Sequence, residues 1–235
     1  MEAMISNQRE YQILSKAFSR VVVSEIAKGN RSGTLDRLMS ELGLCVGPGE
    51  SLSDFFEHSY SKLLKNYRNE YVFKNAIASK VVKGKHRLSN AYYVTEFKVA
   101  SSVADVVVFN GTSTAYEIKT EFDSFDRLSS QIDSYSKVFD RVYVVVPYSK
   151  LDRAIDIVPS HVGVYELTER YSLSEKVKAS SNANNICLKT MFECLRKSEY
   201  LEVVLRNFDY IPSKSPSALK RECLDFFVML GKERA

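Results

Sequence analysis

The sequence has few residues of the kinds that signal disorder, and it has no long apolar segment. Nine glycines and five prolines account for only 14 of the 235 residues, which excludes a low-complexity or largely disordered chain. The longest apolar runs, such as residues 142–146, have the length of a strand and fall far short of the roughly 20 residues that cross a bilayer. Residues 1–10 contain no apolar signal core. We therefore expect a folded, cytoplasmic protein with no membrane partner.

Cysteine and charge also exclude some functions. The four cysteines form no Cys-x-x-Cys pair and have no nearby histidine, which argues against a zinc site and favours free thiols. The formal charge is only +4 and the pI is near 8.7, whereas strongly basic nucleic-acid-binding domains have a pI above about 9. A phosphate-binding site must therefore be a local patch. The densest basic segment, residues 80–87, is either a solvated helix end or a contact for a phosphate backbone.

Hydrophobic periodicity divides the chain into three regions. Residues 1–66 are expected to form an N-terminal helical extension packed on the core, and residues 171–235 a C-terminal helical region with helices over 186–207 and through 219–230. Residues 67–170 change period and are expected to form an α/β core. The expected core elements are a helix around Glu70, strands at 92–99, 105–109 and 114–119, a helix at 127–139, a strand at 141–147, a short helix at 150–156 and a strand at 162–167.

The second and third expected strands carry the charged residues that most suggest chemistry, and Asn110-Gly111 predicts a hairpin between them. Asp105 stands in an otherwise apolar strand, where a carboxylate is costly unless it is paired or binds a cation. Glu117 and Lys119 alternate onto one face of the next strand, and the hairpin brings Asp105 beside Glu117. Two neighbouring carboxylates favour a hard cation such as Mg²⁺ or Mn²⁺. The adjacent lysine would then orient the attacking water and stabilise phosphoryl charge.

At these residues the sequence resembles the PD-(D/E)XK nuclease superfamily, and within it a small bacterial and phage branch. The superfamily pattern is an Asp, a hairpin and Glu-x-Lys on the adjacent strand, as Asp105 and residues 117–119 stand here. The resemblance covers roughly residues 68–167. It implies a restriction-endonuclease-like core with a mixed central sheet, in the order α-β-β-β-α-β that the periodicity also predicts, with helical additions at both ends. Ala104 stands where the family has a proline, at a position that binds no ligand.

The resemblance extends to residues outside the hairpin. It implies that Glu70, on the first core helix, is the upstream acid, with Glu96 as the competing residue. Some branches add Gln-x-x-x-Tyr on the helix after the third strand, and Gln131 and Tyr135 occupy those positions on one helix face. The implied roles are metal binding by Glu70, Asp105 and Glu117, water positioning by Lys119, and support of the site by Gln131 and Tyr135.

The activity that this resemblance implies is a Mg²⁺- or Mn²⁺-dependent phosphodiesterase, a nuclease for which DNA is favoured over RNA as the substrate. The resemblance also implies a role in phage defence, phage biology or repair, which are functions of other members of the superfamily. A protein partner or a homo-oligomer is left open. Two other functions are also left open, namely a catalytically inactive nucleic-acid-binding module and an interaction protein that binds a partner through its flanking helices.

Each candidate residue also has a structural interpretation. The charged residues of the hairpin can form an ion pair inside the sheet. Gln131 and Tyr135 can belong to an ordinary amphipathic helix, with the tyrosine in the core and the glutamine at its edge. Glu70 can pair with Lys74 at i,i+4 on a solvated helix face. The three-dimensional surroundings of these side chains distinguish the two kinds of role.

Overall fold

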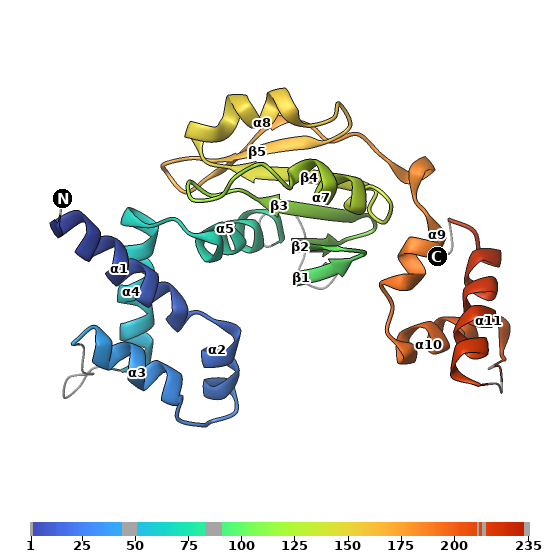
Figure 1. The fold of residues 1–235 in the computed structure, drawn as a ribbon, viewed down its shortest axis with the longest axis horizontal. Helices are drawn as coiled ribbons and strands as arrows, with labels where there is room; N and C mark the ends of the chain where they lie inside the picture. Colours follow the sequence, from blue (N-terminus) through green and yellow to red (C-terminus); the bar gives the residue numbers. More distant parts are fainter. Residues whose placement is uncertain (1, 44–50, 83–90, 211, 213–214, 233–235) are drawn as a thin grey trace. The chain divides into compact units, whose positions relative to one another are not determined.

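The computed structural model describes residues 2–43, 51–82, 91–210, 212 and 215–232 (Figure 1). The chain divides into two compact units. Unit 1 comprises Met1–Asn75 with Thr120–Phe122, and unit 2 comprises Ala76–Lys119 with Asp123–Ala235. The expected α/β architecture is present in unit 2, which contains a mixed six-stranded sheet. Within the described ranges, every helix is too short or too polar to span a membrane.

Unit 1 is built from helices, as its periodicity predicts. They are α1 (Glu2–Ala17), α2 (Arg20–Ala27), α3 (Gly33–Glu41), α4 (Leu52–Asn66) and the first part of α5 (Glu70–Ile77). α3 begins where the Ser32 hydroxyl accepts a hydrogen bond from the Leu35 N–H, and α4 begins with a capping box between Ser51 and Asp54. The apolar faces of α1, α2 and α3 meet in a small core made of Ile13, Ala17, Val22, Leu35, Leu38 and Met39.

The sheet of unit 2 has the strand order β1-β2-β3-β4-β5-β6. Its strands are β1 (Tyr92–Val99), β2 (Ser102–Phe109), β3 (Ser113–Ile118), β4 (Arg141–Val146), β5 (Gly163–Leu167) and β6 (Leu173–Val177). β1, β2 and β3 form an antiparallel meander, β3, β4 and β5 are parallel, and β6 is antiparallel to β5. The predicted turn between β2 and β3 is confirmed, and Gly111 there has a φ of 87°, which a glycine adopts without strain.

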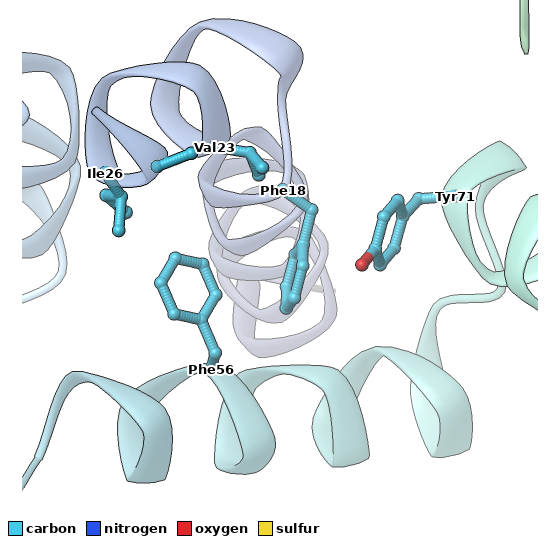
Figure 2. Close-up of a pocket in the computed structure, with 6 residues that line it drawn as sticks. Phe18, Val23, Ile26, Phe56 and Tyr71 are labelled. Atoms are coloured by element: carbon cyan, nitrogen blue, oxygen red, sulfur yellow. The ribbon is translucent and has the colours of Figure 1, made fainter. Parts of the chain in front are cut away.

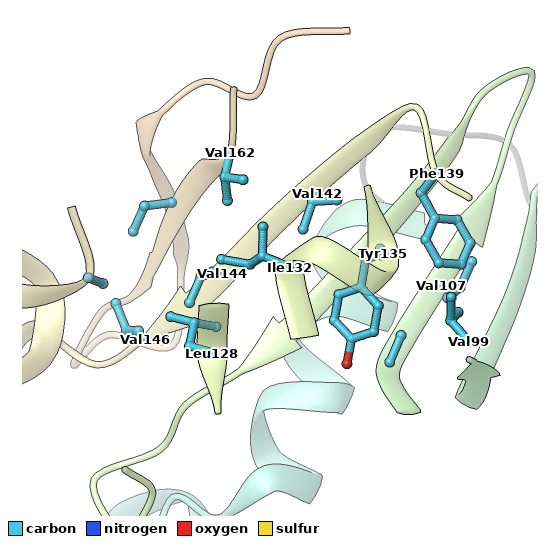
Figure 3. Packing of buried hydrophobic residues seen from close by; sticks show 14 of the residues in the cluster. Val99, Val107, Leu128, Ile132, Tyr135, Phe139, Val142, Val144, Val146 and Val162 are labelled. Carbon is cyan, nitrogen blue, oxygen red and sulfur yellow. The ribbon is translucent and has the colours of Figure 1, made fainter. Parts of the chain in front are cut away.

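Two helices cover one face of this sheet. α7 (Leu128–Tyr135) connects β3 to β4, and α8 (Leu151–Ile157) connects β4 to β5. Figure 3 shows Leu128, Ile132 and Tyr135 of α7 among the valines of the sheet. The β-branched valines pack well on a pleated surface, and their burial contributes hydrophobic stabilisation to this unit. α7 is therefore held firmly over β2, β3 and β4.

The opposite face of the sheet carries a row of tyrosines instead. The row consists of Tyr116, Tyr143 and Tyr165, which alternate along their strands with valine, alanine and glutamate residues that point to α7. The ring centroid of Tyr143 lies 5.7 Å from that of Tyr116 and 4.8 Å from that of Tyr165. Burial raises the pKa of the Tyr165 hydroxyl to about 12, so it stays protonated at neutral pH. Gly163 has no side chain because the Tyr143 ring lies 2.2 Å from the position that a Cβ would take.

The prediction that the chain is helical from residue 172 onward is wrong for Leu173–Val177, which form β6. This short segment becomes a strand because the backbone of β5 is available to pair with it, so tertiary context overrides weak local preference. The Tyr143 hydroxyl also donates a hydrogen bond of 2.6 Å to Glu175 of β6. The sheet therefore continues beyond residue 170.

The prediction of a single helix over residues 186–207 is also wrong. It consists of α9 (Leu188–Glu193) and α10 (Lys197–Phe208), separated by a turn. The Glu199 carboxylate accepts a hydrogen bond of 2.6 Å from the Arg196 N–H and so starts the second helix. The turn lets α9 and α10 pack with α11 (Pro216–Met229) around the ring of Phe192. The helix around Glu70 ends as α5 at Ile77 and continues as a π-helix over Ala78–Val82.

Candidate active site

The β2–β3 hairpin brings the first two predicted site residues together. Val106 pairs with Tyr116, so the next position of the antiparallel register places Asp105 opposite Glu117. The Oδ2 atom of Asp105 accepts a hydrogen bond of 2.7 Å from the Ile118 N–H. This bond joins β2 to β3 beyond their last ladder pair, and it holds the Asp105 carboxylate at the end of β3.

Glu117 lies at the centre of a hydrogen-bond network. Its side chain is only 2% exposed. Oε1 accepts hydrogen bonds from Lys119 Nζ at 2.7 Å and from Gln131 Nε2 at 2.6 Å, and Oε2 lies 2.7 Å from the Tyr135 hydroxyl. Gln131 and Tyr135 are one turn apart on α7, which packs on this face of the sheet. Three donors therefore satisfy a carboxylate that is almost completely withdrawn from water.

Lys119 supplies the positive charge in this network. Its side chain is 8% exposed, and Nζ donates to both Glu117 Oε1 and Gln131 Oε1, the latter at 2.9 Å. The Lys119 N–H donates to the Val145 carbonyl at 3.0 Å, which continues the pairing of β3 with β4. The backbone of the lysine is thus fixed by the sheet and its ammonium by two side chains. Lys119 and Glu117 thus form a buried ion pair at the end of β3, as the structural interpretation of these residues predicts.

Tyr135 acts as a hydrogen-bond donor. The residue is fully buried, and its hydroxyl lies 2.7 Å from the Val103 carbonyl as well as 2.7 Å from Glu117. Burial raises the pKa of the Tyr135 hydroxyl, and the negative charge of Glu117 raises it further. The hydroxyl therefore keeps its single proton and shares it between two acceptors. A base role for Tyr135 is unfavourable in this environment.

Glu70 and Glu96, the two candidates for the third acid, belong to different units. Glu70 belongs to unit 1, where it is 53% exposed and pairs with Lys74 Nζ at 2.6 Å. Glu96 of β1 is exposed and stands at the register position opposite Asp105, between the pairs Thr95–Val106 and Phe97–Ala104. Its φ is 56°, a left-handed conformation that is unusual for a residue with a side chain.

The metal-binding set stays a prediction. Among the residues that the structure describes, no three His, Cys, Asp or Glu side chains gather as a group able to hold a metal ion. Glu70 is in unit 1, whereas Asp105 and Glu117 are in unit 2. Of the basic segment at residues 80–87, the described part includes Lys80, whose Nζ lies 5.7 Å from the centroid of the Tyr171 ring. Residues 83–87 of that segment lie outside the described residues.

Several contributors to the network have no signal in the sequence. The Val103 carbonyl and the Ile118 N–H are backbone groups, so no residue type marks them. The left-handed backbone of Glu96 is equally invisible, since glycine is the usual residue there. The spacing of Gln131 and Tyr135 was the available signal for α7, and the structure brings both side chains to Glu117.

Unit 1 contains a separate, apolar pocket of about 350 Å³ (Figure 2). Phe18, in the turn between α1 and α2, lines it with Phe56 of α4 and Tyr71 of α5, together with Val23, Ile26 and Ala27 of α2. The rings of Phe18 and Phe56 meet edge to face at 69°, and those of Phe18 and Tyr71 are stacked at 4.5 Å. The lining is aliphatic and aromatic, with the Tyr71 hydroxyl as its polar group, and it offers no group for hydrolysis.

Comparison with known proteins identifies relatives of this chain. The family described as "Bacteriophage P4 protein cII" matches residues 64–228. Protein cII of Enterobacteria phage P4 is 31% identical over 148 residues, which is 60% of this chain and 53% of the relative. The chain thus spans about half the length of that curated relative. A solved protein of unknown function from Silicibacter pomeroyi, SPO1766, is similar at 14% identity and a TM-score of 0.32 over 63% of this chain and 79% of its own.

Proposed function

The chain belongs to the bacteriophage P4 protein cII family, and we propose that it is a metal-dependent nuclease that hydrolyses phosphodiester bonds in nucleic acid, with DNA favoured over RNA. The observation that carries the proposal is the position of Asp105 opposite Glu117, with Lys119 directly after the end of β3. The order α5-β1-β2-β3-α7-β4, with β3 parallel to β4, supports it, because the PD-(D/E)XK core has this order of elements.

The proposal assigns Asp105 and Glu117 to the binding of a divalent cation. Carboxylate oxygens on two neighbouring strands are the ligands that Mg²⁺ and Mn²⁺ prefer, and Asp105 and Glu117 provide them, with Glu70 proposed as the third. When bound, such an ion supplies charge neutralisation and polarisation of the scissile phosphodiester. In the structure Lys119 supplies the positive charge beside Glu117. Binding of a cation there therefore requires Glu117 to share its charge between the ion and the lysine.

The protein side chains have distinct tasks in this proposal. Gln131 and Tyr135 hold the Glu117 carboxylate in one orientation from α7, which is itself fixed by the valine core. Lys119 orients the attacking water and stabilises charge that develops on the phosphoryl oxygens. Its ammonium is presented by two side chains and a sheet-bonded backbone, so it needs little reorganisation during the reaction.

The test is a cleavage assay on plasmid, single-stranded DNA and RNA with Mg²⁺ or Mn²⁺, using the full chain and Asp105→Asn. We expect Asp105→Asn to abolish cleavage while its melting curve stays near that of the wild type, because it removes a charged ligand and a repulsion between carboxylates together. Asp133→Asn is the matched control, since Asp133 is exposed on α7 and should be silent. The proposal fails if the wild type cleaves none of the substrates or if EDTA leaves cleavage unchanged.

A second candidate function, a nucleic-acid-binding module without catalysis, is favoured by one observation. Both oxygens of Glu117 already accept hydrogen bonds from protein donors, and the charge of the carboxylate is balanced by Lys119. A site of this kind is stable without a metal ion. Calorimetric titration with Mg²⁺ and Mn²⁺ separates the two functions: a nuclease binds the ion and loses that binding in Asp105→Asn, whereas the binding module retains nucleic-acid affinity and shows no metal-dependent heat.

A further inference from the structure

Three aromatic rings of unit 1 lie in nearly parallel planes and are called the aromatic stack here: Tyr11, Tyr67 and Phe122. Tyr67 is the middle ring. Its centroid lies 4.6 Å from that of Phe122 at an interplanar angle of 26°, and 6.1 Å from that of Tyr11 at 23°. The Phe122 residue is 53% exposed, although it is fully apolar. The stack therefore ends in a phenyl ring that water reaches.

This geometry differs from the interior packing of the same unit. Phe18, Phe56, Tyr60 and Tyr71 meet mostly edge to face, with interplanar angles of 69° for Phe18–Phe56 and 89° for Tyr60–Tyr71. Edge-to-face contacts close a hydrophobic cluster on several sides. Parallel rings instead leave flat faces at the end of the row. An open flat face of this kind matches another planar ring, such as a nucleobase, because every base has a π-face.

Basic residues stand close to Tyr67 in the sequence. Lys65 lies in the last turn of α4 and is exposed, and it forms no ion pair or hydrogen bond with any residue that the structure describes. Arg68 follows Tyr67 directly, and its Nε donates to the Leu64 carbonyl at 2.9 Å. Lys62, one turn earlier, is neutralised by Glu10 at 3.0 Å. The exposed ammonium of Lys65 is therefore available to a phosphate.

We propose that the aromatic stack binds single-stranded nucleic acid, with a nucleobase against the Phe122 ring and a neighbouring phosphate at Lys65. The choice of nucleic acid as partner rests on the proposed function, and the geometry supplies the site and the binding mode. Phe122 follows Lys119 by three residues, and three extended residues of chain reach about 10 Å.

The experiment measures binding without catalysis. Fluorescence anisotropy of a labelled oligodeoxythymidine of about 12 nucleotides, a length within the range that stacking sites occupy, is recorded with the full chain in EDTA. Phe122→Ala should weaken binding about 5- to 150-fold, the loss expected when one base loses its aromatic partner. Phe122→Tyr keeps the ring and should keep the affinity. Tyr92→Ala removes a ring that is 75% exposed on β1 and serves as the matched control, with no expected change.

Two further readouts separate binding on the ring from a merely structural effect. The chain contains no tryptophan, so Phe122→Trp introduces a single reporter whose fluorescence a stacked base should quench. Lys65→Ala should lower the slope of log K against log salt by about 0.7, the contribution of one phosphate contact on a single strand. Melting curves of the same variants show whether they are folded.

The outcomes are distinct from those of the cleavage assay. The inference is overturned if the chain does not bind the oligonucleotide, if Phe122→Ala binds within twofold of the wild type, or if the reporter fluorescence is unchanged at saturation. Unaltered cleavage by Phe122→Ala would support the nuclease proposal and show that cleavage does not need the aromatic stack. Binding that depends on Phe122 in a chain that cleaves nothing would leave the stack standing and favour the binding module.

Discussion

Two glutamate–lysine pairs in different regions of this chain have almost the same length, but their glutamates differ strongly in exposure. In unit 2, Lys119 Nζ lies 2.7 Å from Glu117, and the two side chains are 8% and 2% exposed. In unit 1, Lys74 Nζ lies 2.6 Å from Glu70, and the two side chains are 14% and 53% exposed. A buried charge depends on its partner for compensation, whereas an exposed one is compensated by water. Breaking the two pairs should therefore change the free energy of unfolding by different amounts, although their contact distances are almost equal.

The comparison also bears on function. Glu117 is held by Gln131 and Tyr135 in addition to its lysine, so its position is determined by the packing of α7. Glu70 lies in the first turn of α5, is 53% exposed and pairs with Lys74. A preorganised carboxylate suits catalysis or metal binding, and a solvated one can adjust when a ligand arrives. Substitutions in the two pairs test this difference.

The largest effect is expected for Lys119→Met. It leaves the buried Glu117 carboxylate without its positive charge, so the free energy of unfolding in EDTA should fall by about 3–5 kcal/mol. In the cleavage assay the same variant should lose about 10²–10⁴-fold in rate, the scale of one electrostatic or acid–base group. Urea unfolding and initial rates measure the two quantities.

The control for Lys119→Met is the double variant Glu117→Gln with Lys119→Met, which removes both charges and should recover part of the lost stability. Added Mg²⁺ should also restore stability to the single variant if the cation binds at Glu117. A fall of less than about 1 kcal/mol would contradict the view that the lysine compensates a buried charge. Normal cleavage in a destabilised variant would limit Lys119 to a structural role.

An intermediate effect is expected for Tyr135→Phe. The substitution leaves Glu117 Oε2 and the Val103 carbonyl without their shared donor, and should lower the free energy of unfolding by about 1–3 kcal/mol. Tyr148→Phe is the matched control, because Tyr148 is 75% exposed, and its change should stay within about 0.5 kcal/mol. Equal effects of the two variants in urea unfolding would show that the Tyr135 hydroxyl contributes nothing specific to the network.

The smallest effect is expected for Lys74→Met. Methionine keeps the aliphatic part of the Lys74 side chain, which is only 14% exposed, and water replaces the ammonium around the half-exposed Glu70. The free energy of unfolding should therefore change by only about 0.3–0.5 kcal/mol, as for other i,i+4 pairs on helices. If Glu70 is the third metal ligand, Glu70→Gln should weaken Mg²⁺ binding in calorimetry while Lys74→Met does not. A loss of several kcal/mol in Lys74→Met would remove the contrast between the two pairs.

Local sequence signals were sufficient to predict the structure of segments whose conformation depends mainly on their own residues. Asn110-Gly111 predicted the hairpin that places Asp105 opposite Glu117, because only a turn with left-handed backbone joins two twisted strands so tightly. The i,i+4 spacing of Gln131 and Tyr135 predicted that both point the same way from α7. β6 was missed because a five-residue edge strand draws its structure from the partner that it pairs with.

The sequence by itself determined the helical character of unit 1, the first five strands of the sheet and the placement of two carboxylates on adjacent strands, with a lysine directly after the second strand. It could do so because periodicity, turn residues and alternation are local properties. Only the tertiary structure decided what those charges contact. Burial beneath α7 turns Glu117 into a carboxylate satisfied by Lys119, Gln131 and Tyr135, while exposure leaves Glu70 to the solvent. The physical reason is that the free-energy cost of a charged side chain depends on how far it is removed from water. Only the folded chain removes side chains from water.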